Sequence, residues 1–287
     1  QNMKQKLEVN LKKCDFVSNR LIDEYLFGIN HPYGKYSSTI AYDALHPEQL
    51  RRFFDQYYVN GHCTIFVAGK LPHNIETLLN ENFGSLPLNK AQLPHLTHPA
   101  EAATEKKYRI INDKEGIQGA IRIASHFPGI HHPHFTKAQV LNTLFGGYFG
   151  SRLMSNIRED KGYTYGIHSY MQNHVQQSAW MISTEAGKEV CEATITEVYK
   201  EMQVLREKTV PEEELLLVKN FLIGTILGDL DGPFHIIGRW KNIILNELAE
   251  DYFYTSVAGI KNVTTKEIQE LANQYLLPEK FYELVVV

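Results

Sequence analysis

The sequence predicts an α+β protein made of two tandem units, each a mostly antiparallel sheet with helices on one face. A repeat is the first sign of this architecture. Residues 46–57 (HPEQLRRFFDQY) and 264–275 (TTKEIQELANQY) share a cap-like start, an acidic first turn, apolar residues at helical spacing and a final Gln-Tyr. Each copy leads into a short apolar segment, 64–68 and 282–286. The second sign is the order of elements in the second unit, where strands come early and helices fill the stretch before a last strand.

Length and composition are those of a globular protein with about two domains. The chain has 287 residues, of which 43% are hydrophobic and 22% charged, with a net charge of -4 and a pI of about 6.4. This charge provides no electrostatic surface for nucleic acid or anionic lipid. No apolar run approaches the roughly 20 residues that span a bilayer. The composition therefore predicts no nucleic-acid partner and no membrane association.

The three cysteines, Cys14, Cys63 and Cys191, lie far apart in the sequence. Such an odd and sparse set argues against a disulfide framework and favours a reducing compartment. The first residues (QNMKQK) are not a signal peptide and read like the inside of a helix, as in a processed chain. Localisation stays open on these grounds, with the cytoplasm favoured over the periplasm.

Residues 1–86 are predicted to be the C-terminal part of the first domain. Apolar residues at helical spacing predict a helix over residues 4–28, and the turn sequence NHPYG at 30–34 ends it. Three prolines and little periodicity follow residue 86, which predicts a linker over residues 87–103. The other elements expected in the first domain are a helix at 47–58, a strand at 63–68 and a helix at 74–82.

Residues 104–287 are predicted to be the second domain. Alternating apolar and polar residues predict two early strands and a hairpin whose turn contains Asn173 and His174. Amphipathic periodicity predicts helices between and after these strands. The strands are expected at 107–112, 118–126, 163–171, 178–186 and 282–286. The helices are expected at 135–145, 151–159, 189–207, 211–228, 234–248 and 264–275.

The residues present do not predict a metal site. Neither H-x-x-E-H nor H-E-x-x-H occurs in the sequence. The densest histidine group, residues 131–134, is interrupted by Pro133 in an expected loop, so its side chains cannot form an i, i+4 pair on a helix. No G-x-S-x-G, Walker or dinucleotide-binding motif occurs either. No cofactor is therefore predicted within residues 1–287.

Residues 145–165 (FGGYFGSRLMSNIREDKGYTY) have the most unusual pattern in the chain. Three glycines in five positions allow backbone approaches that side chains forbid. Arg158 lies near the end of a short expected helix, Gly162 breaks that helix, and Tyr165 follows on a strand. Arg158 and Tyr165 are thus predicted to converge across the break. A structural alternative is an exposed arginine paired with a local carboxylate and a tyrosine half-buried on the sheet.

This segment resembles the second, inactive domain of the insulinase/pitrilysin-type zinc metallopeptidases, the inverzincins. That family has a glycine-rich turn, then Ser-Arg-Leu, then Arg-Glu-x-x-Gly-x-x-Tyr. The matching positions here are Gly146, Gly147, Gly150, residues 151–153, Arg158, Glu159, Gly162 and Tyr165. The sequence HPYG at 31–34, followed by a helix ending in Tyr57 and Tyr58, resembles the back half of the family's first domain. The resemblance covers the whole chain and implies tandem units like those of mitochondrial processing peptidase.

The resemblance also implies that zinc is bound elsewhere. The family's H-x-x-E-H motif would precede Gln1, and its downstream glutamate would align with Gln5 or Lys6, with Glu8 the nearest acid. Zinc is therefore expected only on a partner chain or an upstream segment. Residues 1–287 alone are not expected to be active, and the enzymatic status of the whole protein stays open. We further expect residues 1–86 to depend on the second unit or on a neighbouring chain to cover their apolar face.

In family members that divide the work between two chains, one chain supplies zinc and the other an arginine and a tyrosine. The resemblance assigns these roles to Arg158 and Tyr165, which would donate hydrogen bonds to the substrate carbonyl and its oxyanion. It also suggests substrate binding by Gly146, Gly147 and Gly150, with packing as the alternative.

The function expected is the substrate-binding half of a two-chain peptidase that encloses peptides in a chamber. Its partner would be a homologous zinc-bearing subunit, in a heterodimer, or a second copy in a homodimer. One alternative is the C-terminal portion of a full-length zinc peptidase. Another is a non-catalytic scaffold, as in the core subunits of respiratory complexes.

Overall fold

The computed structural model divides the chain into two compact units, which are described separately. The residues that the structure describes are 1–59, 61, 63–87, 96–175 and 177–287. Unit 1 comprises residues Gln1–Tyr36, His98–Thr225 and Glu250–Val287, and unit 2 comprises Ser37–Thr97 and Ile226–Ala249. Residues 88–95 of the predicted linker lie outside the described residues. The domain boundaries at 86 and 103 stay predictions.

Unit 1 is built on one five-stranded sheet in the order β1-β5-β2-β4-β3. Its strands are β1 (Lys107–Ile110), β2 (Gln118–Phe127), β3 (Thr164–Asn173), β4 (Ser178–Gly187) and β5 (Tyr282–Val286). Only the β1–β5 pair is parallel, and the other neighbours are antiparallel. The α+β class, the mostly antiparallel sheet and the predicted hairpin are therefore confirmed.

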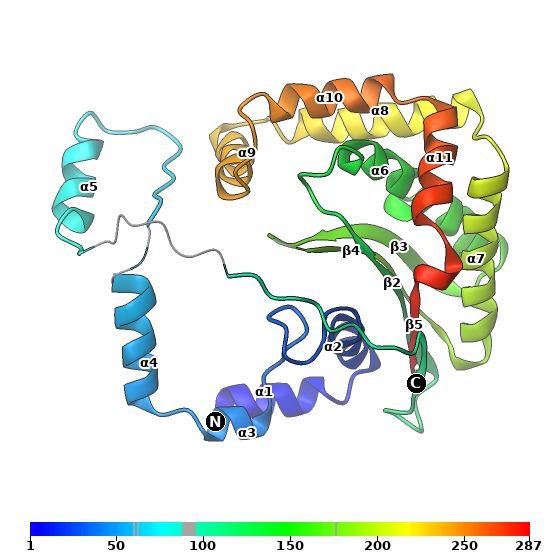
Figure 1. Ribbon diagram of the computed structural model, residues 1–287, viewed down its shortest axis with the longest axis horizontal. Helices are drawn as coiled ribbons and strands as arrows, with labels where there is room; N and C mark the ends of the chain where they lie inside the picture. Colours follow the sequence, from blue (N-terminus) through cyan, green and yellow to red (C-terminus); the bar gives the residue numbers. More distant parts are fainter. Residues whose placement is uncertain (60, 62, 88–95, 176) are drawn as a thin grey trace. The chain divides into compact units, whose positions relative to one another are not determined.

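Both faces of this sheet carry buried side chains. Successive strand residues point to opposite sides, so each face has its own set of residues to bury. Ile121 and Ile123 of β2 are buried on one face, and Ala120 and Ala124 on the other. Figure 1 shows α6, α7 and α11 on one side of the sheet and α2 on the other. The helices α6, α7 and α11 thus pack on one face, as predicted, while a helix from the start of the chain covers the second. Their bounds are α2 (Cys14–Phe27), α6 (Phe135–Asn142), α7 (Cys191–Glu207) and α11 (Thr265–Tyr275).

The single helix predicted over residues 4–28 is two helices in the structure, α1 (Asn2–Asn10) and α2. Lys13 adopts an extended backbone with φ -93° and ψ 124°, which ends helical hydrogen bonding before α2 starts. After this break, α2 presents Ile22, Leu26 and Phe27 to the sheet, where they pack in one apolar cluster with strands β2, β4 and β5. Residues 1–36 thus cover their apolar face against the strands of unit 1, and for residues 37–86, which belong to unit 2, the expected dependence stays a prediction.

A buried arginine holds α2 on its face of the sheet. The side chain of Arg122 on β2 is only 1% exposed and forms an ion pair with Asp15 of α2. Its Nε donates to Asn19 Oδ1 at 2.9 Å, and its Nη1 donates to the carbonyls of Ile121 and Thr184. A buried charge is tolerated only when it is paired and hydrogen-bonded in this way.

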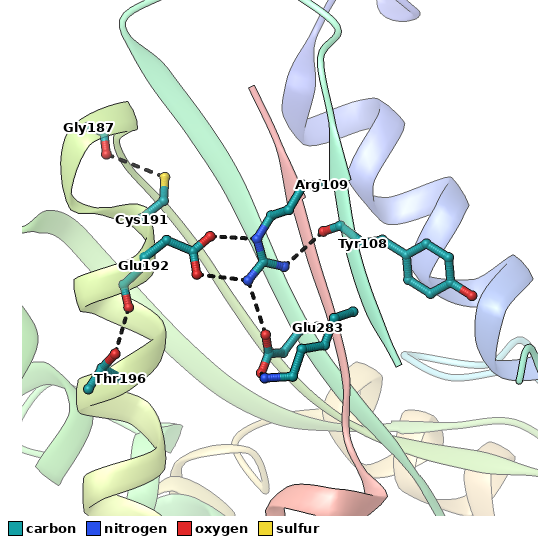
Figure 2. A network of polar contacts seen from close by, with 8 residues as sticks. Tyr108, Arg109, Gly187, Cys191, Glu192, Thr196 and Glu283 are labelled. Atoms are coloured by element: carbon teal, nitrogen blue, oxygen red, sulfur yellow. Dashed lines mark hydrogen bonds and ion pairs between the residues drawn. The ribbon is translucent and has the colours of Figure 1, made fainter. Parts of the chain in front are cut away.

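A second ionic network lies on the opposite face, at the start of α7. Figure 2 shows Arg109 of β1 between Glu192 of α7 and Glu283 of β5. Glu283, whose side chain is 3% exposed, also pairs with Lys107 at 3.2 Å. The Arg109 guanidinium holds the pKa of Glu192 below its ordinary value. The network therefore joins β1, β5 and α7 through Arg109, with Glu283 as its buried carboxylate.

The remaining helices of unit 1 follow the predicted pattern with additions. The predicted helix at 189–207 begins with a 3-10 turn, η4 (Lys188–Val190), before α7, and the predicted helix at 211–228 is α8 (Glu212–Gly228). Helix α10 (Tyr252–Asn262) and the 3-10 turn η5 (Pro278–Lys280) were not predicted. The predicted cap of the closing helix is present, because the Thr264 side chain accepts a hydrogen bond from the Glu267 N–H at 3.2 Å.

Unit 2 is helical in its described part. Helices predicted at 47–58, 74–82 and 234–248 are confirmed, and α3 was not predicted. Their bounds are α3 (Thr39–Asp43), α4 (Pro47–Phe54), the π-helical turn η1 (Asp55–Val59), α5 (Ile75–Phe83) and α9 (Pro233–Leu245). The strand predicted at 63–68 is wrong: no described strand of unit 2 lies beside it to share ladder hydrogen bonds. Phe53, Phe54 and Tyr58 remain more than half exposed.

Replacing Glu283 with Ala should lower the free energy of unfolding by about 1.5–3 kcal/mol, because the hydrogen bond between its buried carboxylate and Arg109 is lost. Urea unfolding followed by tryptophan fluorescence measures this loss. The matched control is Glu192→Ala, which removes the other carboxylate of Arg109 but at a side chain that is 68% exposed. It should cost less than about 1 kcal/mol. Equal losses in the two variants would contradict this account.

Candidate functional site

The glycine-rich segment forms a turn that packs directly on strand β3. The helix α6 continues into a π-helical turn, η2 (Thr143–Gly147), and a second such turn, η3 (Met154–Asp160), ends just before β3. Gly146 is buried against β3, and a Cβ atom at this position would lie 2.7 Å from Ser169 Cβ and 2.9 Å from Leu153 Cδ1. Gly147 and Gly150 are exposed. A side chain at Gly146 would therefore collide with its buried neighbours, so this position needs glycine for packing.

Polar side chains hold this turn on the strand. Asn142 Nδ2 donates to the Ser169 carbonyl at 3.0 Å, and Ser169 Oγ donates to Asn142 Oδ1 at 2.7 Å. The buried Trp180 ring donates from Nε1 to the same Ser169 Oγ at 2.8 Å. Sequence reasoning missed this trio, although an asparagine within the apolar stretch AQVLNTLF is a signal that could have been followed.

Arg158 lies on η3 and is half-buried. Its guanidinium carbon sits 4.6 Å from the centre of the Phe149 ring, so the exposed glycine-rich loop provides a cation–π contact. The ion pairs found within the described ranges do not include Arg158. The alternative of a structural pair with a local carboxylate thus has no support among these residues.

Gly162 connects η3 to β3 through a left-handed backbone with φ 65°. The N–H of Gly162 donates to the Arg158 carbonyl at 3.2 Å, and the N–H of Tyr163 donates to the Ile157 carbonyl at 3.0 Å. These bonds close the end of the helix as a glycine C-cap does. Arg158 and Tyr165 are therefore carried by two elements that adjoin in the chain and pack together.

Tyr165 lies on a β-bulge and is 91% exposed. Thr164 pairs with Ala186 and Ile167 with Thr184, so two residues of β3, Tyr165 and Gly166, stand opposite the single Glu185 of β4. Such a bulge re-aims a side chain at the edge of a sheet. The structural alternative of a half-buried tyrosine does not fit this exposure.

Two threonines that the sequence reasoning missed hold the bulge. Thr164 Oγ1 accepts from the Gly166 N–H at 3.1 Å and lies 2.8 Å from Thr184 Oγ1. The Thr184 hydroxyl is also 2.8 Å from the Gly166 carbonyl. The sequence signal was the glycine after Tyr165, since glycine inside a strand often marks a bulge.

A pocket of about 440 Å³ lies beside Tyr165, at the end of the hairpin and the start of β2. Two carboxylates, Glu185 and Glu189, and two aromatic rings, Tyr163 and Tyr165, border it, whereas Arg158 is not among its lining residues. The remaining lining residues are Ile117, Gln118, Gly162, Thr164, Ala186, Gly187 and Val190.

The described residues contain no group of three or more His, Cys, Asp or Glu side chains placed to hold a metal ion. In the histidine-rich loop at 131–134, His134 Nδ1 lies 2.9 Å from the hydroxyl of Tyr275, a hydrogen bond within the fold. None of the helices in the described part of the chain combines the length and apolar character that a membrane crossing requires.

Comparison with known families identifies the class of protein. The family described as "Peptidase M16 inactive domain" matches residues 44–222, which is more than half of the chain. The protein therefore belongs to this family of zinc-protease relatives. The resemblance inferred from residues 145–165 is confirmed.

Individual relatives agree with this assignment. The chain is 24% identical to the uncharacterized zinc protease YmxG of Bacillus subtilis over 249 residues, which are 82% of this chain and 59% of YmxG. It is 20% identical to the probable inactive metalloprotease YmfF of Bacillus subtilis, with 98% of this chain and 65% of YmfF covered. The chain thus spans less than two thirds of the length of these curated relatives.

Solved structures share the fold. The peptidase M16 inactive domain from Pseudomonas fluorescens has a TM-score of 0.84 at 20% identity, and the match covers 99% of this chain and 68% of that one. A chain of Complex III2 from Candida albicans has a TM-score of 0.75 at 14% identity, with coverage of 100% and 70%. These likenesses confirm the predicted fold, like that of mitochondrial processing peptidase.

Replacing Gly146 with Ala should lower the free energy of unfolding by about 1–3 kcal/mol, because the new methyl group meets Ser169 and Leu153 in a packed interior. Thermal unfolding measures the change. Gly147→Ala is the matched control, since its Cβ would have no neighbour nearer than 3.3 Å, and it should cost less than about 1 kcal/mol. A Gly146 variant as stable as the Gly147 variant would rule out the packing requirement.

Proposed function

We propose that this chain supplies the substrate-binding half of a two-chain, zinc-dependent peptidase and that cleavage takes place in a chamber enclosed with the partner. The zinc would be held outside residues 1–287, on a homologous subunit, and would activate the attacking water. The observation that carries the proposal is the exposure of Tyr165 on a bulge of β3, the strand that packs against the helical turn carrying Arg158. Both side chains are candidates for substrate contact, because Tyr165 is 91% exposed and Arg158 takes part in none of the ion pairs among the described residues.

The chemistry follows from what the two groups donate. The Tyr165 phenol has one O–H donor, and the Arg158 guanidinium has several N–H donors and a permanent positive charge. Both would hydrogen-bond the carbonyl oxygen of the scissile peptide, and these bonds strengthen as that oxygen becomes an oxyanion. The Phe149 ring limits the movement of the guanidinium, and the bulge keeps the phenol in the open.

The pocket beside Tyr165 would receive a substrate side chain next to the scissile bond. Its volume of about 440 Å³ is within the range of pockets that bind small groups. Glu185 and Glu189 would disfavour an acidic substrate residue there by like-charge repulsion. Gly147 and Gly150, exposed on the turn, would leave the backbone open to the peptide, whereas Gly146 serves packing.

A second candidate function differs in where zinc is held. YmxG is named a zinc protease, and this chain spans 59% of its length, which favours a metal motif elsewhere in the same polypeptide. The coding sequence upstream of Gln1 discriminates the two, since an H-x-x-E-H motif there would place zinc in the same chain. A scaffold without catalysis, the third candidate, would form stable complexes but cleave no peptide with any partner.

Arg158→Gln and Tyr165→Phe should each lower kcat/KM for peptide cleavage on the order of 10²-fold when the full-length protein is assayed with its zinc-bearing subunit, because one oxyanion donor is removed. Tyr254→Phe, an equally conservative change at a tyrosine that is 73% exposed on α10, serves as control and should leave the rate unchanged. Unchanged rates for both Arg158→Gln and Tyr165→Phe would show that the pair has no catalytic part.

A further inference from the structure

The glycine-rich turn presents one large aromatic ring to solvent. Phe149 is 62% exposed, although apolar side chains of this size are mostly buried in a fold. Its ring meets the guanidinium of Arg158, whose central carbon lies 4.6 Å from the ring centre. A guanidinium is attracted to the face of an aromatic ring and stacks well on it. The exposed ring therefore has a specific contact, and that contact is with a residue of the candidate site.

The turn is attached to α8 directly before Phe149. The ring of Tyr148 packs on that of Phe221 of α8, with centres 4.8 Å apart and planes at 31°. The N–H of Ser151 donates to the Tyr148 carbonyl at 3.1 Å, which closes the turn around Phe149. A Cβ atom at Gly150 would lie 2.9 Å from Tyr148 Cε2, so the glycine leaves room for the Tyr148 ring.

The turn is attached to the same helix directly after Phe149. Arg152 Nε and Nη2 donate to the two carboxylate oxygens of Glu214, each at 2.8 Å, and these side chains are 16% and 31% exposed. Such a bidentate pair fixes both partners in direction. The first half of α8 is itself held in unit 1 by Leu215 and Val218, which are 1% and 0% exposed. Phe149 thus stands between two attachments to one well-packed helix.

Arg158 needs a contact that fixes its side chain. Its backbone is held, because its carbonyl accepts from the Gly162 N–H at 3.2 Å. The side chain has several rotatable bonds, and a free arginine loses much conformational freedom when it binds a ligand. It takes part in none of the ion pairs among the described residues. The described part of the chain offers the guanidinium the ring of Phe149 instead.

We propose that Phe149 is a positioning residue: attached to α8 through its neighbours Tyr148 and Arg152, it holds the Arg158 guanidinium in the direction in which this group meets the substrate carbonyl. The inference rests on the proposed function of Arg158, and the ring itself touches no reacting atom. A donor that is already in place needs no reorganisation when the oxyanion forms. Helix α8, far away in the sequence, is thereby part of the support of the site.

The contact itself is tested without any assay of activity. Protons above an aromatic ring are shielded by its ring current, so the side-chain protons of Arg158 should resonate upfield in the full chain labelled at arginine. Arg158→Gln assigns this signal by its loss. Phe149→Leu should abolish the upfield shift, and Phe149→Tyr should keep it. Arg20, whose guanidinium carbon lies 4.9 Å from the Tyr36 ring centre, is an internal control that should not change.

The role in positioning is tested by cleavage kinetics of the full-length protein with its zinc-bearing subunit. Phe149→Leu should lower kcat/KM about 3- to 30-fold, because the guanidinium is less often in place. The loss should lie in kcat, with KM little changed, since the interaction concerns the transition state. Phe149→Tyr keeps a ring and should stay within about twofold of the wild type. Phe234→Leu, at a phenylalanine of α9 that is 70% exposed, is the matched control and should have no effect.

A double variant separates positioning from direct contact with substrate. If Phe149 acts through Arg158, Phe149→Leu/Arg158→Gln should be no slower than Arg158→Gln alone, because the two changes remove the same interaction. A double variant that is slower by the full factor of Phe149→Leu would show that the ring binds substrate itself, and would overturn the inference.

Two failures can be told apart. A wild-type rate for Arg158→Gln would remove the catalytic role of the arginine, and the inference with it. A slow Arg158→Gln variant combined with an unchanged Arg158 resonance in Phe149→Leu, or with a wild-type rate for Phe149→Leu, would overturn the inference alone and leave the proposed function standing.

Discussion

Burial of the five-stranded sheet on both faces is the constraint on which the other features of unit 1 depend. Strand residues alternate between two sides, so each apolar side needs its own cover. Helices α6, α7 and α11 cover one side and α2 the other, and a buried charge on each side secures the contact: Arg122 toward α2 and Glu283 toward α7. Because α2 comes from the start of the chain, residues 1–36 share one core with the strands of unit 1.

The candidate site lies at the edge of this sheet, on strand β3, which the rest of the chain covers only in part. Strand β3 is at one edge of the sheet. The turn after α6 covers its middle, because Asn142 hydrogen-bonds the strand and Gly146, without a side chain, lets the turn pack closely on it. At its beginning, the bulge held by Thr164 leaves Tyr165 outside. An edge strand that is closed in its middle and open at one end leaves one side chain exposed to solvent without exposing the whole edge to aggregation.

Much of this arrangement was accessible from the sequence, because it is local. Periodicity located the strands and most helices, and the pattern of glycines with Arg158 and Tyr165 identified the site segment and the family. The break at Lys13 and helix α10 were not predicted, because neither has a strong local sequence signal. The strand expected at 63–68 was wrong for a different reason: apolar residues show that a segment can pair, but only a neighbouring strand makes it do so.

The sequence by itself determined the class of fold, the order of its elements and the segment that carries the arginine and tyrosine, since helical spacing, alternation and turn residues act over a few positions. Only the tertiary structure decided that α2 lies on the sheet of unit 1, that Tyr165 is turned outward by a bulge, and that histidines from three distant segments surround Phe27. These features depend on contacts between residues that are far apart in the chain, and no local pattern specifies which distant partner a side chain will meet.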